Sequence, residues 1–195
     1  MGNYRWRWIT TLGILAALWA AIELSLGTTL YLLRVPLRGE FLTVLTLPLM
    51  FATRSLIPRR GSVLAVGLTA AVVRWLLGGA FAPQVSLAIA VEALLVELGL
   101  GPVNGGAIVR WRGALAGALG MGYTAAHPVL FWGLLLGGGK GIELPVGIGG
   151  LLFFGAILGL HLIGGAAAGI WARTLLSRLT VPLMKPISDD VERPQ

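Results

Sequence analysis

Six long apolar runs, separated by short loop-like segments, constrain this chain more than any other feature of its sequence. A helix that crosses a bilayer needs about 20 mostly apolar residues. Of the 195 residues, 56% are hydrophobic and 12% are charged, whereas a soluble domain is usually about 25% charged. The mean hydropathy is +0.86. The chain is therefore predicted to be an integral membrane protein with most of its length in lipid.

The six runs predict six transmembrane helices in a single all-α domain over residues 1–180, followed by a polar, disordered tail over residues 181–195. The separators, such as PRRG and GLGPVNGG, are rich in residues typical of loops. The second and fourth runs are short, so one of them could be re-entrant instead of crossing fully. The runs are Trp8–Leu33, Phe41–Ile57, Gly61–Leu77, Val85–Leu100, Gly113–Leu136 and Gly147–Leu176.

The basic residues predict that both termini are cytoplasmic, because Lys and Arg are enriched in the cytoplasmic loops of membrane proteins. With the N-terminus inside, six crossings put three basic residues, Arg34, Arg38 and Lys140, in outer flanks, and Arg74 within a span. An odd number of crossings would divide the remaining eleven between the two sides. These eleven inner residues are Arg5, Arg7, Arg54, Arg59, Arg60, Arg110, Arg112, Arg173, Arg178, Lys185 and Arg193.

Several kinds of chemistry have no motif in this chain. It has no cysteine and two histidines, which leaves no thiolate site and little for a metal site. It lacks the glycine loop with Lys and Ser/Thr that binds nucleotide phosphates, and it lacks a nucleophile-elbow serine. We therefore expect no catalytic residues, no metal and no cofactor of its own.

Ionisable residues within the predicted spans are the strongest candidates for function, since a charge at mid-bilayer costs roughly 2.5–3.5 kcal/mol. Glu23, Arg74, Glu92 and His127 come from four helices. The predicted topology places all four between the middle of the membrane and the outer leaflet. This favours a polar pocket that opens outward. The alternative is an internal ion pair of Arg74 with Glu23 or Glu92 that only locks the bundle.

Three more residues complete the predicted substrate-binding set: Tyr123, one turn before His127, Trp132 near the outer end of its span, and His161 at mid-depth. Each could instead be a packing or interface residue. Two ionised acids against Arg74 leave one negative charge, so either one acid carries a proton or a ligand supplies positive charge or hydrogen-bond donors. We expect a small polar ligand, heterocyclic or amine-bearing. Glu97, nearer the cytoplasm, is expected to pair with the inner arginines.

The stretch LAALWAAIELSLG carries two overlapping pairs of alanines four apart, Ala16 with Ala20 and Ala17 with Ala21. Small residues at this spacing let helices approach closely in lipid. At 100° per residue, Ala16 and Ala20 lie within about 60° of Glu23, whereas Ala17 lies about 120° away. If Glu23 faces the pocket, Ala17 and Ala21 are the better candidates for a docking face, and Ala16 and Ala20 are expected to pack inside.

The segments AAIELSLGTTL, PRRGSVLAVGLTAAVVRWL and AIAVEALLVELGL, together with the length, the six spans and the alanine spacing, give the chain a resemblance to a known family. From Ala16 to Leu176 it resembles the substrate-specific (S) component of energy-coupling factor (ECF) transporters. No single motif carries the resemblance.

The resemblance implies a subunit of the prokaryotic plasma membrane that captures a small polar vitamin or vitamin precursor at its outer face. It implies docking on a membrane coupling subunit that is joined to two ATPase subunits, which alone use ATP. The docking positions would be Ala16, Ala17, Ala20 and Ala21, and the loop RVPLRGEF would cover the pocket. The metal-binding branch has a histidine after the initiator methionine, where this chain has Gly2, so nickel and cobalt are not expected. No nucleic acid is expected as a partner.

Two other classes of function stay open from the sequence. One is an intramembrane acid–base enzyme that uses Glu92 and His127, which would need both groups within hydrogen-bond reach of one substrate atom. The other is a ligand-free membrane assembly subunit, in which Arg74 only locks the helices together.

Overall fold

The computed structural model describes residues 2–35, 37–78, 82–102, 108–130 and 148–183, and its regular secondary structure there is entirely helical. A helix lies in each of the six predicted runs, so the all-α prediction is confirmed. The first run contains a continuous helical stretch that passes through a five-residue π-helical segment, η1. The elements are α1 (Gly2–Ile22), η1 (Glu23–Gly27), α2 (Thr28–Leu32), α3 (Arg38–Leu56), α4 (Ser62–Leu77), α5 (Ala82–Leu100), α6 (Arg110–Val129) and α7 (Ile148–Leu183).

Three helical stretches in the described residues are long and apolar enough to cross a membrane: Trp6–Leu32, Pro83–Leu100 and Gly150–Arg178. They indicate a membrane protein, although they are fewer than the six crossings predicted. The apolar helix α4 has 16 residues, about 24 Å at 1.5 Å per residue, which is shorter than the roughly 30 Å hydrocarbon core. Helix α3 carries charges at both of its ends. The predicted end of the fifth run, beyond residue 130, lies outside the described residues, as does the tail from residue 184.

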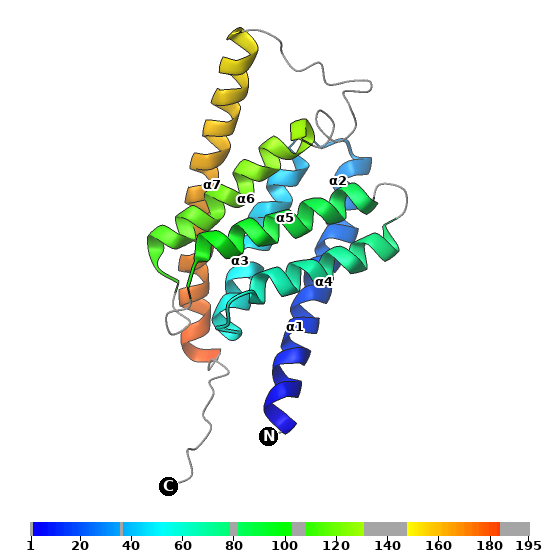
Figure 1. Cartoon of the computed structure of the whole chain (residues 1–195), viewed down its shortest axis with the longest axis vertical. Helices are drawn as coiled ribbons and strands as arrows, with labels where there is room; N and C mark the ends of the chain where they lie inside the picture. The colour runs from blue at the N-terminus through cyan, green and yellow to red at the C-terminus, as the bar shows by residue number, and fades with distance from the viewer. Residues whose placement is uncertain (1, 36, 79–81, 103–107, 131–147, 184–195) are drawn as a thin grey trace.

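The helices form one bundle in which α4, α5 and α6 lie oblique to the longer α1 and α7 (Figure 1). Helices α4 and α5 run side by side in opposite directions, and α6 packs along α7. The start of α1 and the end of α7 lie toward the same end of the molecule. The core between the helices includes the fully buried side chains of Trp19, Leu47, Met50 and Phe51.

Two contacts set the register of α4 against α5. The two helices come closest at Gly67, where an added Cβ would overlap the Ala93 methyl group. The Val63 amide donates to the Glu97 carboxylate at 3.0 Å. In each contact the two residue numbers add up to the same value, as expected where two straight antiparallel helices lie opposite one another. Residues equally far from the α4–α5 connection therefore lie at the same level.

Glycines bring α6 and α7 into backbone contact. Gly113 and Gly117 on α6 face Gly165 and Gly169 on α7 across one interface, where a Cβ on Gly117 would lie 2.8 Å from the Gly169 nitrogen. By contrast, a Cβ on Gly159 would meet no atom within 4 Å among the described residues. On α7, Gly165 and Gly169 thus pack against α6, whereas Gly159 has free space around it in the described structure.

This difference gives a matched test. Gly117→Ala is expected to lower the free energy of unfolding by about 2 kcal/mol, because the methyl group must push α6 away from α7. Gly159→Ala is expected to leave it unchanged or raise it by about 0.5 kcal/mol, since it removes backbone freedom in the unfolded chain and meets nothing in the fold. Equilibrium unfolding in mixed detergent micelles measures both. Equal effects of the two variants would contradict the α6–α7 interface.

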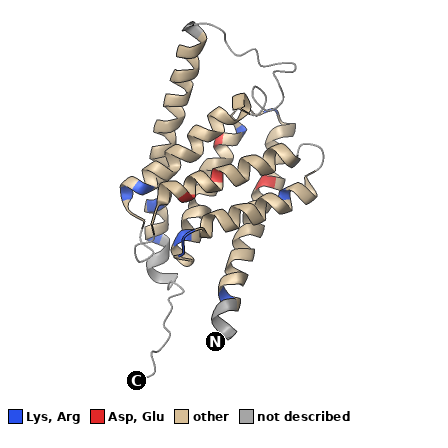
Figure 2. Cartoon of the chain, in the orientation of Figure 1, with Lys and Arg blue, Asp and Glu red and all other residues tan. Residues whose placement is uncertain are grey.

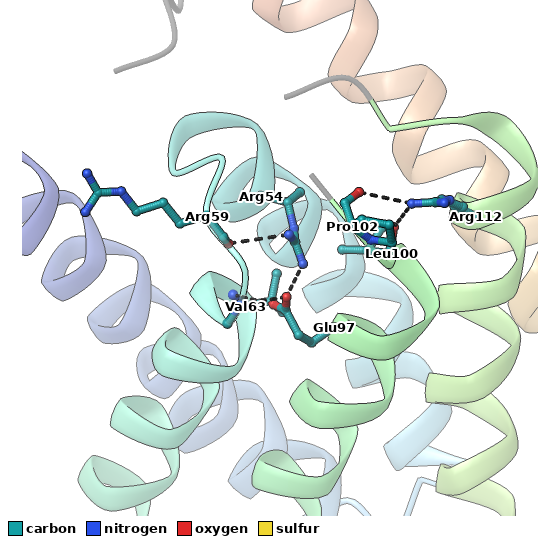
Figure 3. A network of polar contacts seen from close by, with 8 residues as sticks. Arg54, Arg59, Val63, Glu97, Leu100, Pro102 and Arg112 are labelled. Carbon is teal, nitrogen blue, oxygen red and sulfur yellow. Dashed lines mark hydrogen bonds and ion pairs between the residues drawn. The ribbon is translucent and has the colours of Figure 1, made fainter. Parts of the chain in front are cut away.

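An ion pair between α3 and α5 lies where α4 begins and α5 ends (Figure 3). Arg54, near the end of α3, pairs with Glu97 on α5, with side chains 4% and 12% exposed. The Glu97 carboxylate also accepts hydrogen bonds from the backbone amides of Gly61, at 2.8 Å, and Val63, at 3.0 Å. A carboxylate is favourable at the N-terminus of a helix such as α4. The expected pairing of Glu97 with an inner arginine is confirmed.

Removing one partner of this pair should be costly. Glu97→Gln leaves Arg54 buried without its counter-charge, and we expect the free energy of unfolding to fall by about 3 kcal/mol. Arg60→Gln removes a charge from the exposed α3–α4 connection and should change it by less than about 0.5 kcal/mol. The same detergent unfolding experiment compares them, and a Glu97→Gln variant as stable as Arg60→Gln would refute the role of the pair.

Candidate functional site

Three ionisable residues of the predicted site come together in the interior. Glu23 on η1, Arg74 on α4 and Glu92 on α5 are 6%, 8% and 7% exposed. Glu23 interacts electrostatically with Arg74 and with Glu92. Figure 2 shows acidic residues within the bundle, whereas many basic residues lie toward the helix ends. One cation and two acids therefore share a region that is closed to bulk solvent.

The π-helical segment begins at Glu23. Such segments appear mostly as single-turn bulges in α-helices, frequently at functional sites. Here the segment ends at Gly27, where an added Cβ would lie 3.4 Å from Leu42 and 3.6 Å from the Glu23 carboxylate. These are ordinary van der Waals distances, so α3 packs directly against the end of the π-helical segment beside the acid. The apolar run in the sequence predicts a regular helix here and gives no sign of the π-helical segment.

Uncharged polar residues from neighbouring helices surround the acids. Trp19 lies one turn before Glu23 and interacts with it, and Thr43 on α3 interacts with Glu92. The Thr43 hydroxyl lies 3.0 Å from that of Thr124 on α6. Helices α1, α3, α4, α5 and α6 all contribute to this polar region.

Four buried polar atoms in this part of the bundle have no partner in full hydrogen-bond geometry within the described structure, although Trp19 faces Glu23 and Thr43 faces Glu92. Buried polar groups are normally paired, because leaving one without a partner costs about 1–3 kcal/mol. Their residues are all at least 90% buried. The atoms are Trp19 Nε1, Arg74 Nε, Ser86 Oγ and Glu92 Oε1. We call these four residues, together with Glu23, the buried polar cluster.

Tyr123 and His127 form a pair on α6. The Tyr123 hydroxyl lies 2.9 Å from His127 Nδ1, and the ring centroids are 5.3 Å apart. Tyr123 also interacts electrostatically with Glu92, which places this pair beside the buried polar cluster. Trp132 lies outside the described residues.

His161 on α7 has a different partner, Glu40 at the start of α3. Its Nε2 lies 3.0 Å from Glu40 Oε1, and its Nδ1 lies 2.7 Å from the Ile157 carbonyl oxygen. A carbonyl oxygen only accepts, so Nδ1 carries a hydrogen. The contact with Glu40 then needs a proton, either on Nε2 or on the carboxyl. His161 thus bridges α7 and α3, a contact that the sequence reasoning missed because it placed Glu40 in a loop.

The alanines of α1 divide between two faces. Ala16 and Ala20 are 0% and 1% exposed and pack in the core with Trp19, whereas Ala17 and Ala21 are exposed. Ala16 and Ala20 therefore offer no surface to a partner. Of the four predicted docking positions, Ala17 and Ala21 remain available.

The sequence held a signal for two of the missed residues of the cluster. Trp19 is one turn before Glu23, so it shares a helix face with the acid. Ser86 is four residues after the start of α5 and Arg74 is three residues before the end of α4, which sets both near one level in an antiparallel pair. Thr43 has no such signal, because its place beside Glu92 depends on how α3 crosses the bundle.

In the described part of the chain, no group of three or more His, Asp or Glu side chains is placed to hold a metal ion. Comparisons with family models, with curated proteins and with solved structures found no match to this chain.

If the buried polar cluster binds a ligand, loss of an acid there should change the free energy of unfolding differently from loss of the acid in the Arg54–Glu97 pair. Glu92→Gln should raise the free energy of unfolding of the ligand-free protein by about 1 kcal/mol, because it removes a buried charge that faces Glu23 and has an unpartnered oxygen. Unfolding in detergent without added solutes measures this. A loss of stability instead, like that expected for Glu97→Gln on the same helix, would favour the purely structural lock.

Proposed function

We propose that this protein is the substrate-binding membrane subunit of an ECF-type importer and that it binds a small polar solute at the buried polar cluster. The observation that carries the proposal is the convergence of Glu23, Arg74 and Glu92, from three helices, with unpartnered polar atoms among them. Ionisable groups inside a membrane are costly and usually mark a ligand path or site. A small vitamin or vitamin precursor suits a site of this kind.

The charge balance supports a ligand over a closed lock. Arg74 can neutralise one of the two acids, and Glu23 and Glu92 repel each other when both are ionised. A lock that only stabilised the bundle would gain from equal numbers of each charge and from complete hydrogen bonding. The Arg54–Glu97 pair has this balanced form, with one charge of each sign and two backbone amides on the carboxylate.

The proposal includes six crossings with both termini in the cytoplasm of a prokaryotic cell. Several arginines of the predicted inner flanks meet at one end of the bundle. Arg173 on α7 donates to the Ile108 carbonyl oxygen before α6, at 3.1 Å, and Arg112 donates to the Leu100 carbonyl oxygen at the end of α5, at 3.3 Å. Basic residues gathered at one end of a membrane bundle favour the cytoplasmic side for that end.

The proposed partners are a membrane coupling subunit and two ATPase subunits, which would supply the energy of ATP. The exposed alanines Ala17 and Ala21 suit the coupling subunit, because association of helices in lipid depends on close packing of small residues. Glu23 and Trp19 turn to the opposite, buried side of the same helix. One helix would thus join the ligand to the energy source.

A thermal-shift screen of the purified protein against vitamins and their precursors tests the binding role. A ligand at 100 times its dissociation constant is expected to stabilise the protein by about 2.7 kcal/mol, and Glu92→Gln should abolish this shift while the protein stays folded. Arg74→Ala is a second test variant. Absence of any stabilising compound, together with absence of coupling and ATPase subunits after mild purification, would favour the ligand-free assembly subunit.

Substitutions on α1 test the docking role. Ala17→Trp and Ala21→Trp should leave ligand binding intact and lower transport by at least about tenfold, because the bulky ring prevents close contact with a partner helix. Ala20→Trp should instead destabilise the fold, since Ala20 has no free space. Uptake in cells and binding to purified protein separate the two effects. Loss of binding in Ala17→Trp would place that face inside the bundle.

A further inference from the structure

The buried polar side-chain atoms without a hydrogen bond in the described residues fall into two groups along the α4–α5 pair. Arg54 Nε and Ser62 Oγ lie at the end that the Arg54–Glu97 pair holds. The remaining four belong to the buried polar cluster: Trp19 Nε1, Arg74 Nε, Ser86 Oγ and Glu92 Oε1. The serines of the two groups are equally buried, since Ser62 and Ser86 are 5% and 4% exposed. The groups differ in charge, because Arg54 and Glu97 form a neutral pair, whereas the buried polar cluster has two acids and one arginine.

The register of α4 against α5 brings Ser86 to the level of Arg74. Gly67 lies against Ala93, and two turns further along α4, seven residues on, is Arg74. Seven residues back along the antiparallel α5 is Ser86. Both residues are buried, so both turn into the bundle at the same level. The Trp19 ring lies two turns away, at 3.3 Å from an added Cβ on Gly67, and Trp19 is linked to Arg74 through Glu23, which interacts with both.

The unpartnered atoms have complementary hydrogen-bonding roles. Trp19 Nε1 and Arg74 Nε can only donate, Glu92 Oε1 in its ionised form can only accept, and the Ser86 hydroxyl can do either. With Glu23 and Glu92 ionised, the cluster carries one negative charge. A partner that satisfies all of these atoms needs an acceptor, a donor and a positive charge.

We propose that the buried polar cluster binds a small organic nitrogen base that extends from Glu92 to the level of Arg74 and Ser86, with N–H groups facing Glu92 and an acceptor atom facing Arg74. This inference rests on the proposed function and deepens it by naming the class of ligand. The Arg54–Glu97 end is closed, because its ion pair is neutral and its carboxylate is already held by two backbone amides.

Simpler occupants fit the cluster less well. An inorganic cation would bind Glu92 but leave the N–H groups of Trp19 and Arg74 without an acceptor. An organic anion would pair with Arg74 but would add a third negative charge beside Glu23 and Glu92. Water molecules together with a proton on one acid could also satisfy these atoms, but a site filled in this way would show no preference for a cationic solute.

The cysteine-free chain permits a direct test with single-cysteine variants. Ser86→Cys and the matched control Ser62→Cys are purified in detergent, where both ends of the bundle are reachable, and treated with two methanethiosulfonates of similar size. One reagent carries a trimethylammonium group and the other a sulfonate group. Each transfers its thioalkyl group to the cysteine as a mixed disulfide and releases methanesulfinate, so the rate reports how readily a charged solute reaches the thiol.

The cationic reagent is expected to modify Ser86→Cys at least about tenfold faster than the anionic reagent does, as for a cleft with one sign of charge. It should also react at least about tenfold faster there than with Ser62→Cys. Adding Glu92→Gln to Ser86→Cys should remove the preference for the cation, whereas Asp189→Asn in the C-terminal tail should keep it. Equal rates at the two serine positions, or a preference for the anionic reagent, would overturn the inference.

The thermal-shift screen separates this inference from the proposed function. Compounds that stabilise the protein should carry a basic nitrogen with a nearby acceptor, and they should slow the modification of Ser86→Cys. If the stabilising compounds are all acids or lack a basic nitrogen, the ligand class is wrong while the binding subunit stands. If no compound stabilises the protein and no importer subunits accompany it, both proposals fail.

Discussion

The contact between α4 and α5 is the constraint on which the rest of this structure depends. Gly67 and Ala93 bring the two helices close together, and the Glu97 carboxylate fixes their register by binding the first amides of α4. A buried ion pair offsets its desolvation only when further hydrogen bonds satisfy its charges, and the Glu97 carboxylate receives such bonds from Arg54 and the two amides. With the register of α4 against α5 fixed in this way, Arg74 and Glu92 stay inside the bundle.

The first helix has a buried face and an exposed face, and each face has its own proposed role. Its inner face presents Trp19 and Glu23 to α4 and α5, and its outer face presents Ala17 and Ala21. The π-helical segment at Glu23 lies where the polar part begins. In the proposed importer subunit, a ligand beside Glu23 and a coupling helix beside Ala17 would contact the same continuous helical stretch. Ligand binding and docking of the coupling subunit would then be linked through that stretch.

The sequence predicted each helix well, since apolar runs and loop residues depend only on the local chain. It also placed Glu23, Arg74 and Glu92 at one broad level, although the register of α4 against α5 sets Arg74 level with Ser86, six residues from Glu92. It did not reveal the bridge between His161 and Glu40, which are 121 residues apart, nor Thr43 beside Glu92. These contacts depend on the angles at which α3, α6 and α7 cross, and helix crossing angles follow from side-chain packing over the whole interface.

The sequence by itself thus determined that the chain is helical and apolar, as in a membrane protein, with a few charged residues inside its apolar helices. The tertiary structure decided which charges meet. Glu92 and Glu97 are five residues apart on one helix, yet Glu97 finds Arg54 and two amides, whereas Glu92 has an oxygen without a partner in the described residues. Only the packing of α3 and α4 around α5 separates them, because a carboxylate in an apolar interior is stabilised by the partners that the fold brings within hydrogen-bond reach.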